Sequence, residues 1–155
     1  MRGNDLPVEY PVSSGGVVIR RSPQGVEVLI CSQMKTPPLW GLPKGTPKPG
    51  ENLEETARRE VTEETGLQVE IKKTIGSIRY WFVKGGVKYH KTVHFFLMAP
   101  TGGAIEDHDP EYDVVQWFSA SQALRTLTYK NEVEIVEKAV ALFEDEGAAG
   151  TKGPP

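Results

Sequence analysis

The stretch "GTPKPGENLEETARREVTEETGL", residues 45–67, decides the fold of this chain. Residues 52–65 have the pattern of a helix, and Gly66 stands where a left-handed cap would end it. Glutamates are crowded into the second half of this helix, and like charges on one helix repel each other. Their concentration therefore needs a physical reason.

The helical angles place these charges. At about 100° per residue, Glu60, Glu63 and Glu64 fall within an arc of roughly 100°. The apolar stripe borders that arc and consists of Leu53, Ala57 and Val61. The solvated side is assigned to Glu55, Arg58, Thr62 and Thr65. We therefore expect the three carboxylates to lie where the helix meets the rest of the protein, held together by Mg²⁺, which prefers clustered carboxylate oxygens. Arg59 can pair with Glu55 and Glu63 at a spacing of four residues and would orient the cluster. The alternative to a metal site is a structural charge network.

The loop before the helix is suited to a phosphorylated ligand. Gly45 and Gly50 allow sharp turns and a close approach of the backbone, and a carbonyl near Gly45 could join the carboxylates around a metal. Lys44 precedes them and would meet a phosphate as a point charge. Carboxylates, a divalent metal and a lysine together favour attack on a phosphoanhydride.

Composition narrows the class of protein. The 155 residues suffice for one domain, and 38% hydrophobic with 25% charged residues is typical of a globular protein. The net charge of -3 argues against a broad surface for nucleic acid or anionic membranes. Cys31 is the single cysteine, and we interpret it as a buried strand residue in a chain from a reducing compartment. With neither a signal peptide nor an apolar run of ~20 residues, a cytoplasmic protein without a membrane partner is expected.

The remaining pattern predicts one domain at residues 12–144, with an N-terminal extension at 1–11 and a flexible tail at 145–155. Two hairpins are expected: "SSGGVVIRR" with "VEVLICSQ" around "SPQG", and "LQVEIKKTIGSIRYWFV" with "KYHKTVHFFLMA" around "KGG". The segment "TPPLWGLPKGTPKPGE" is expected to be a loop. An acidic loop, the strand "VVQWFS", a helix capped by Ser119 or Ser121 and a final helix at 131–144 complete the chain.

Residues 45–67 resemble the Nudix box at every specified position. These positions are Gly45, Glu51, Arg59, Glu60, Val61, Glu63, Glu64, Gly66 and Leu67. The resemblance implies an α/β fold, an α/β/α sandwich around a mixed β-sheet in a single domain. It also implies hydrolysis of a nucleoside diphosphate linked to another group, by water, with Mg²⁺ or Mn²⁺ as cofactor and a small nucleotide as substrate.

The same resemblance implies roles for individual residues. Glu60, Glu63 and Glu64 would bind the metal with the Gly45 carbonyl, Glu51 would tie the loop to the helix, and Arg59 would orient the carboxylates. The general base stays open between a helix glutamate and a carboxylate on a later loop. Glu111 is a candidate for such a loop carboxylate near the metal, as in the diadenosine tetraphosphate hydrolases. Its competitors, and the alternative of a merely solvated acidic loop, involve Asp107, Asp109 and Asp113.

Features outside the box favour a dinucleoside polyphosphate as substrate. "KTVHFFLMA" and "PEYDVVQWF" are similar to segments of the animal-type diadenosine tetraphosphate hydrolases. Lys44 stands at a position where the corresponding segment of the MutT-like 8-oxo-dGTP hydrolases resembles "PGG", and this added cation suits a longer phosphate chain. Further phosphate contacts are expected from Arg79, Lys88 and Lys91, with ordinary hairpin surface as the alternative for Arg79 and Lys88. An adenine clamp is expected from Phe95 and Tyr129, unless Phe95 belongs to the core.

Other functions stay open at this point. The alternative substrates are 8-oxo-dGTP or another nucleoside triphosphate, ADP-ribose, diphosphoinositol polyphosphates and the 5′-pyrophosphate of RNA. A nucleotide-sensing domain without activity is the alternative from another class. The oligomeric state is not predicted.

Overall fold

The structure, a computed structural model, describes residues 5–33, 35–112 and 114–152, with side chains up to residue 146. Asp113, one competitor of Glu111, lies outside the described residues, as do residues 1–4 and 153–155. None of the helices in the described ranges is both long and apolar enough to cross a membrane.

The strands form one mixed sheet, in the order β1-β7-β2-β3-β4, with β5 paired to β2, β6 to β7 and β8 to β3. Their bounds are β1 Val8–Glu9, β2 Val12–Ser22, β3 Gly25–Gln33, β4 Leu39–Gly41, β5 Lys44–Gly45, β6 Leu67–Lys84, β7 Val87–Gly103 and β8 Val114–Ser119. Strand β2 is central: its first part runs parallel to β7, and its end runs antiparallel to β3. The mixed sheet that the sequence predicts is confirmed.

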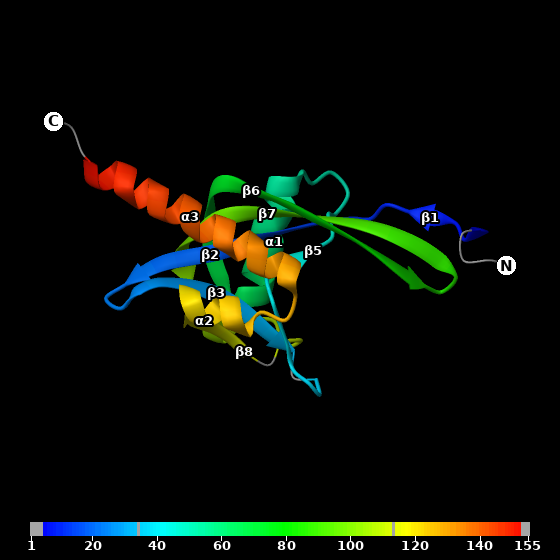
Figure 1. Ribbon diagram of the computed structural model, residues 1–155, viewed down its shortest axis with the longest axis horizontal. Helices are drawn as coiled ribbons and strands as arrows, with labels where there is room; N and C mark the ends of the chain where they lie inside the picture. Colours follow the sequence, from blue (N-terminus) through cyan, green and yellow to red (C-terminus); the bar gives the residue numbers. More distant parts are fainter. Residues whose placement is uncertain (1–4, 34, 113, 153–155) are drawn as a thin grey trace.

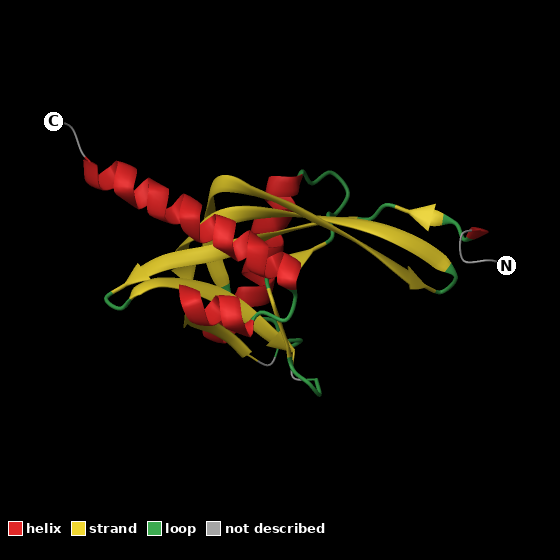
Figure 2. Cartoon of the chain, viewed as in Figure 1, coloured by secondary structure: helices red, strands yellow, loops and turns green. Residues whose placement is uncertain are grey.

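Helices cover both faces of the sheet, so the α/β/α sandwich is confirmed (Figures 1 and 2). Helix α1, Leu53–Thr65, packs on the face of Val18, Phe96 and Met98. Helices α2, Ala120–Thr126, and α3, Lys130–Lys152, lie on the other face, where Phe95 and Val136 are buried. Because side chains alternate across a strand, one buried strand serves both cores.

Helix α1 begins and ends where the sequence predicts. Asn52 Oδ1 accepts a hydrogen bond from the Glu55 N–H at 2.8 Å, and Glu55 Oε1 accepts one from the Asn52 N–H at 3.1 Å, which completes a capping box. Gly66, with φ of 81°, donates its N–H to the Thr62 carbonyl. Because Glu55 is engaged in this cap, its predicted pairing with Arg59 is replaced by other partners of the arginine.

The second hairpin is far longer than the first and projects from the body of the sheet (Figure 1). Gly85 and Gly86, with φ of 58° and 75°, form its turn, and strand β1 pairs with its outer part through Val8 and Lys88. The expected N-terminal extension therefore contributes a short strand.

Two expectations on local structure are wrong. The segment "TPPLWGLPKGTPKPGE" contains β4 and β5, because β3 and β2 supply backbone partners from distant parts of the chain. Helix α3 continues through residues 145–152, beyond the end at residue 144 that the sequence predicts. Glycine costs a helix about 1 kcal/mol per residue, and the two glycines in this segment do not end it.

Candidate active site

The backbone of Gly45 lies directly against the carboxylate of Glu60. Gly45 pairs with Ser14 of β2, and a Cβ added at Gly45 would overlap the Glu60 carboxylate. Only glycine leaves the space for this approach. The structure thus brings together the first residue of the box and its central glutamate, as the sequence predicts.

Arg59 holds three carboxylates. Its Nε lies 2.6 Å from Glu51 Oε2, and its Nη2 lies 2.9 Å from Glu51 Oε1, a two-pronged contact. Its Nη1 donates to Glu60 at 2.8 Å and to Glu63 at 3.2 Å. The hydrogen bond from Arg59 lowers the pKa of Glu51 to about 2. Arg59 therefore orients the acidic cluster, and the prediction that Glu51 ties the loop to the helix agrees with these contacts.

Glu64 is buried at the junction of three segments. Its Oε2 accepts the Lys44 backbone N–H at 2.8 Å, and its Oε1 accepts the Tyr112 hydroxyl at 3.1 Å. Burial raises the pKa of Glu64 to about 8, which outweighs the lowering by these hydrogen bonds; the nearby charge of Glu60 adds to the rise. A buried carboxylate with a neighbouring carboxylate gains most from a cation.

The solvated side of α1 is only partly as expected. Glu55, Arg58 and Thr62 are exposed, but Thr65 is fully buried and donates its hydroxyl to the Val61 carbonyl. One turn beyond Val61, Thr65 continues the apolar stripe. The side chain of Glu63 is 49% exposed, so this glutamate lies at the rim of the cluster.

The acidic cluster is not arranged as a finished metal centre. In the described part of the chain, no three Asp, Glu, His or Cys side chains are grouped so that they could hold a metal ion. The donor set nevertheless suits a hard divalent cation, because the Glu60 carboxylate lies beside the Gly45 backbone, Glu64 binds the N–H of the preceding Lys44, and the charges of the two glutamates interact.

The sequence analysis missed Glu132, a buried residue in the first turn of α3. Its Oε1 accepts the Leu42 N–H at 2.9 Å, and its Oε2 lies 3.8 Å from Lys44 Nζ. Burial raises the pKa of this carboxyl group above its usual value. The backbone of Lys44 thus contacts Glu64 of the box, and its side chain contacts a second carboxylate, that of Glu132.

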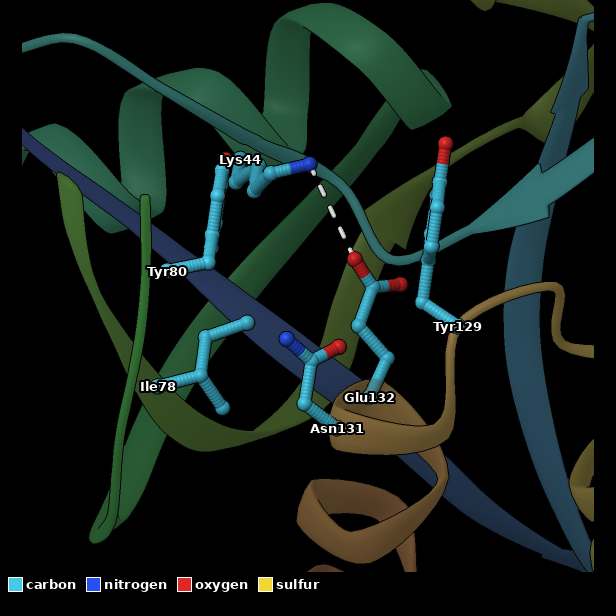
Figure 3. Close-up of a pocket in the computed structure, with 6 residues that line it drawn as sticks. All are labelled: Lys44, Ile78, Tyr80, Tyr129, Asn131 and Glu132. Atoms are coloured by element: carbon cyan, nitrogen blue, oxygen red, sulfur yellow. Dashed lines mark ion pairs between the residues drawn. The ribbon is translucent and has the colours of Figure 1, made fainter. Parts of the chain in front are cut away.

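A cavity of about 340 Å³ opens beside this ion pair. It is lined by Lys44, Ile78, Tyr80, Tyr129, Asn131 and Glu132. Figure 3 shows Tyr80 and Tyr129 on opposite sides of the Lys44–Glu132 pair. A second cavity of about 190 Å³ shares Lys44, Tyr129 and Glu132 and extends to Tyr112, so the hollows lead toward Glu64.

The predicted substrate contacts divide between the two faces of the sheet. Lys91 is opposite Tyr80, and burial together with the charge of Lys44 lowers its pKa. Arg79 alternates with Tyr80 and so faces the other side of the strand, where Lys88 lies 4.8 Å above the ring of Trp81. Arg79 and Lys88 therefore do not line this cavity, and their contact with a substrate stays a prediction.

Of the two aromatics expected to clamp an adenine, only Tyr129 is open to a ligand. Tyr129 is 50% exposed, whereas Phe95 is 0% exposed and packs in the core with Val17 and Val136. A fully buried ring cannot stack on a base. The alternative that Phe95 belongs to the core is confirmed.

The acidic loop joins the box through a neighbour of Glu111. Tyr112 donates to Glu64, and the exposed Glu111 precedes it, with its N–H bound to Asp109 Oδ1 at 2.9 Å. Burial, followed by the charge of Glu64, raises the pKa of Tyr112. Cys31 is buried, as expected, and burial raises the pKa of its thiol.

The residues that the sequence analysis missed, Tyr80, Tyr112 and Glu132, come from three distant segments. A glutamate in the first turn of a helix is ordinary helix chemistry, so Glu132 carries no signal of its own. Only the fold places these residues around Lys44.

The chain matches the family model described as "NUDIX domain" over residues 10–139. It is 42% identical over 106 residues to a protein from Mycobacterium tuberculosis named "Putative mutator protein MutT4", covering 68% of this chain and 43% of that protein. It is 33% identical over 103 residues to the "Putative 8-oxo-dGTP diphosphatase" of Bacillus subtilis, covering 66% and 62%. The chain therefore spans about two fifths to three fifths of these relatives.

Solved structures share the fold at low identity. The Caenorhabditis elegans Ap4A hydrolase in a binary complex superposes with a TM-score of 0.68 at 21% identity, covering 87% of this chain and 98% of that one. A hydrolase of the same fold from Nitrosomonas europaea also superposes with a TM-score of 0.68, at 19% identity, covering 86% and 90%.

Proposed function

The chain belongs to the Nudix hydrolase family, and on that premise we propose that it hydrolyses a phosphoanhydride bond of a dinucleoside polyphosphate such as diadenosine tetraphosphate. One observation carries the proposal. The backbone N–H of Lys44 binds Glu64, while its side chain enters the cavity between Tyr80 and Tyr129. A single residue thus joins the box carboxylates to a hollow with an exposed aromatic ring.

Family members generally need a divalent metal, and we propose Mg²⁺, with Mn²⁺ as a substitute, for this chain. Glu60, Glu63 and Glu64 and the Gly45 carbonyl would hold it. When bound, the metal supplies a positive charge that withdraws electrons from the phosphate oxygens of the scissile bond.

The protein's own residues position the substrate. Lys44 and Lys91 meet the polyphosphate chain as cations, and Tyr129 stacks on a base. Arg59 keeps the box carboxylates oriented without touching the substrate, and Glu51 anchors Arg59. Water attacks phosphorus, the bridging P–O bond breaks, and the departing phosphate leaves with the bonding electrons.

A carboxylate must accept the proton of the attacking water. We propose that Glu111 lies beside the box and accepts this proton, because its neighbour Tyr112 is hydrogen-bonded to Glu64. The box glutamates are the competing bases.

A cytoplasmic location stays a prediction from the single cysteine.

The second candidate substrate is 8-oxo-dGTP. The observation that favours it is the identity of 42% and 33% to relatives whose names refer to mutator function and to 8-oxo-dGTP. Against this stands the cavity, in which tyrosines stand on both sides of Lys44.

A panel of substrates at equal concentration with Mg²⁺ tests the proposal. It comprises diadenosine tetraphosphate, 8-oxo-dGTP, ADP-ribose, a diphosphoinositol polyphosphate and 5′-triphosphorylated RNA, with products separated by chromatography. The Glu60→Gln variant is the control for contaminating activity. We expect the highest kcat/KM for diadenosine tetraphosphate. A higher value for 8-oxo-dGTP would establish the second candidate, and binding without turnover would indicate a nucleotide sensor.

A further inference from the structure

The projecting β6–β7 arm, defined as residues 78–91, carries two different aromatic faces. Tyr80, Phe82 and Tyr89 share one face with Lys91, because Tyr80 pairs with Lys91 and Phe82 pairs with Tyr89. Trp81 and His90 occupy the opposite face, where their rings stack at 4.0 Å. We call the first face the pocket-side face, because its Tyr80 lines the cavity.

The aromatic rings of the pocket-side face form a continuous ladder away from the cavity. The ring centroids of Tyr80 and Phe82 are 5.9 Å apart, and those of Phe82 and Tyr89 are 4.9 Å apart with nearly parallel planes. Phe82 is 37% exposed. A large apolar side chain at the surface is unremarkable by itself, but a stacked series that begins in a ligand cavity points to the ligand.

The charge of the arm suits a polyphosphate. Of the four Lys or Arg in residues 78–91, Lys84 and Lys91 lie at pocket-side positions, and the other two lie on the opposite face with Trp81. Residues 78–91 contain no acidic residue. Lys91 stands across from Tyr80, and burial, followed by the charge of Lys44, lowers its pKa. A polyanion that binds between two cations at the mouth of a cavity relieves the repulsion between them.

Aromatic rings stand on both sides of the lysine that lines the cavity. Tyr129 stands on one side of Lys44, and Tyr80, the first rung of the ladder, stands on the other (Figure 3). A mononucleotide with its phosphates at Lys44 and its base on Tyr129 leaves the ladder unused.

We propose that Phe82 and Tyr89 form a stacking platform for the second base of a dinucleoside polyphosphate. The first base stacks on Tyr129, the phosphate chain passes Lys44 and Lys91, and the second base lies on the arm. This platform rests on the proposed function, because it selects among nucleotides at the same site. It makes the arm the element that distinguishes two-base from one-base substrates.

The test compares two ligands with the same number of phosphates, adenosine 5′-tetraphosphate and diadenosine tetraphosphate, as methylene-bridged analogues that are not hydrolysed. Dissociation constants are measured by calorimetry with Mg²⁺ present. For the wild type, we expect the two-base ligand to bind about tenfold more tightly, since one stacked base is worth that much. Phe82→Leu and Tyr89→Leu should each remove most of this preference and leave the Kd of the one-base ligand within about twofold.

Trp81→Leu is the matched control, because it removes a ring of the same arm on the opposite face. It should leave the preference intact, and thermal unfolding should show that all three variants fold. The platform is refuted if the wild type shows no preference, if Phe82→Leu weakens both ligands equally, or if Trp81→Leu has the same effect. Tight binding of a short single-stranded RNA or DNA that depends equally on Trp81 and Phe82 would replace it with a nucleic-acid surface.

The substrate panel, extended by hydrolysable adenosine 5′-tetraphosphate, separates this proposal from the proposed function. If the wild type hydrolyses neither tetraphosphate, the proposed function fails, while the Kd comparison still decides the platform. If it hydrolyses both with equal kcat/KM and binds both equally, the function stands and the platform fails.

Discussion

The side chain of Lys44 lies 3.8 Å from the carboxylate of Glu132, and these two residues connect the loop before α1 with the first turn of α3. Glu132 is only 3% exposed, and its other oxygen binds the Leu42 N–H. The pair therefore places one positive and one negative side chain together in the lining of the cavity.

Glu132 should make stability depend on pH. Burial raises its pKa in the folded state, so folding favours the protonated form. The stabilisation is complete below the unfolded pKa, near 4.5, and is lost as the pH rises through the folded pKa. Glu132→Gln should therefore raise the Tm at pH 8 by a few degrees, and the gain should vanish toward pH 4. Glu134→Gln, an exposed change in the same helix, is the control. A gain that does not depend on pH would contradict the prediction.

Lys44→Met should raise KM for polyphosphate substrates by about tenfold or more, because a cation that faces the phosphate chain is lost. Its backbone N–H bond to Glu64 survives, so kcat should fall less than kcat/KM. Steady-state kinetics at low and high salt would measure this, since screening should reduce the difference. Lys48→Met, in the same loop and exposed, is the control. An unchanged KM would remove Lys44 from the substrate site.

Glu60→Gln and Glu64→Gln should each lower kcat by ~10² or more while the fold is kept, because the box loses a charged oxygen for the metal. The metal-free variants should be slightly more stable than the wild type, since like charges no longer repel. Glu54→Gln, exposed in the first turn of α1, serves as the control. A kcat near that of the wild type in either variant would refute the metal site.

Glu111→Gln should reduce kcat far more than Asp107→Asn, if the loop carboxylate acts beside the box. Asp109 is a poor control, because its Oδ1 binds the Glu111 N–H and a change there would disturb Glu111 itself. Glu106→Gln is the better second control, being exposed in the same loop. Small, equal effects of all three changes on kcat would mean that the loop is only solvated.

Tyr129→Ala should raise KM for diadenosine tetraphosphate about tenfold with a much smaller effect on kcat, because a stacked base is lost from binding and not from the reaction. An inositol polyphosphate has no base and should not be affected. Tyr10→Ala, which removes a 69% exposed tyrosine of the N-terminal segment, is the control. If KM for every adenine nucleotide stays unchanged, Tyr129 does not bind the base.

The sequence predicts the box well because its information is local. Helix α1 and its Asn52 and Gly66 ends follow from spacing within residues 45–67, and the resemblance to the box implies that Gly45 lies near Glu60. Spacing along the helix is wrong for Arg59, which pairs with Glu51 and not with Glu55, because the loop folds back on the helix. The sequence is wrong again for Phe95, because a position on a strand gives alternation but not which face is buried in the core.

The sequence alone therefore determined the family, helix α1 and its acidic cluster, because these depend on contacts between residues that are near in the chain. Only the tertiary structure decided the cavity beside Lys44. Lys44, Tyr80 and Tyr112 lie in three separate segments, and Tyr129 and Glu132 lie together at the start of α3, so no spacing relates these four segments. The mixed sheet brings these segments together, since its strand order follows from long-range backbone pairing and burial, which determine neighbours across the whole chain.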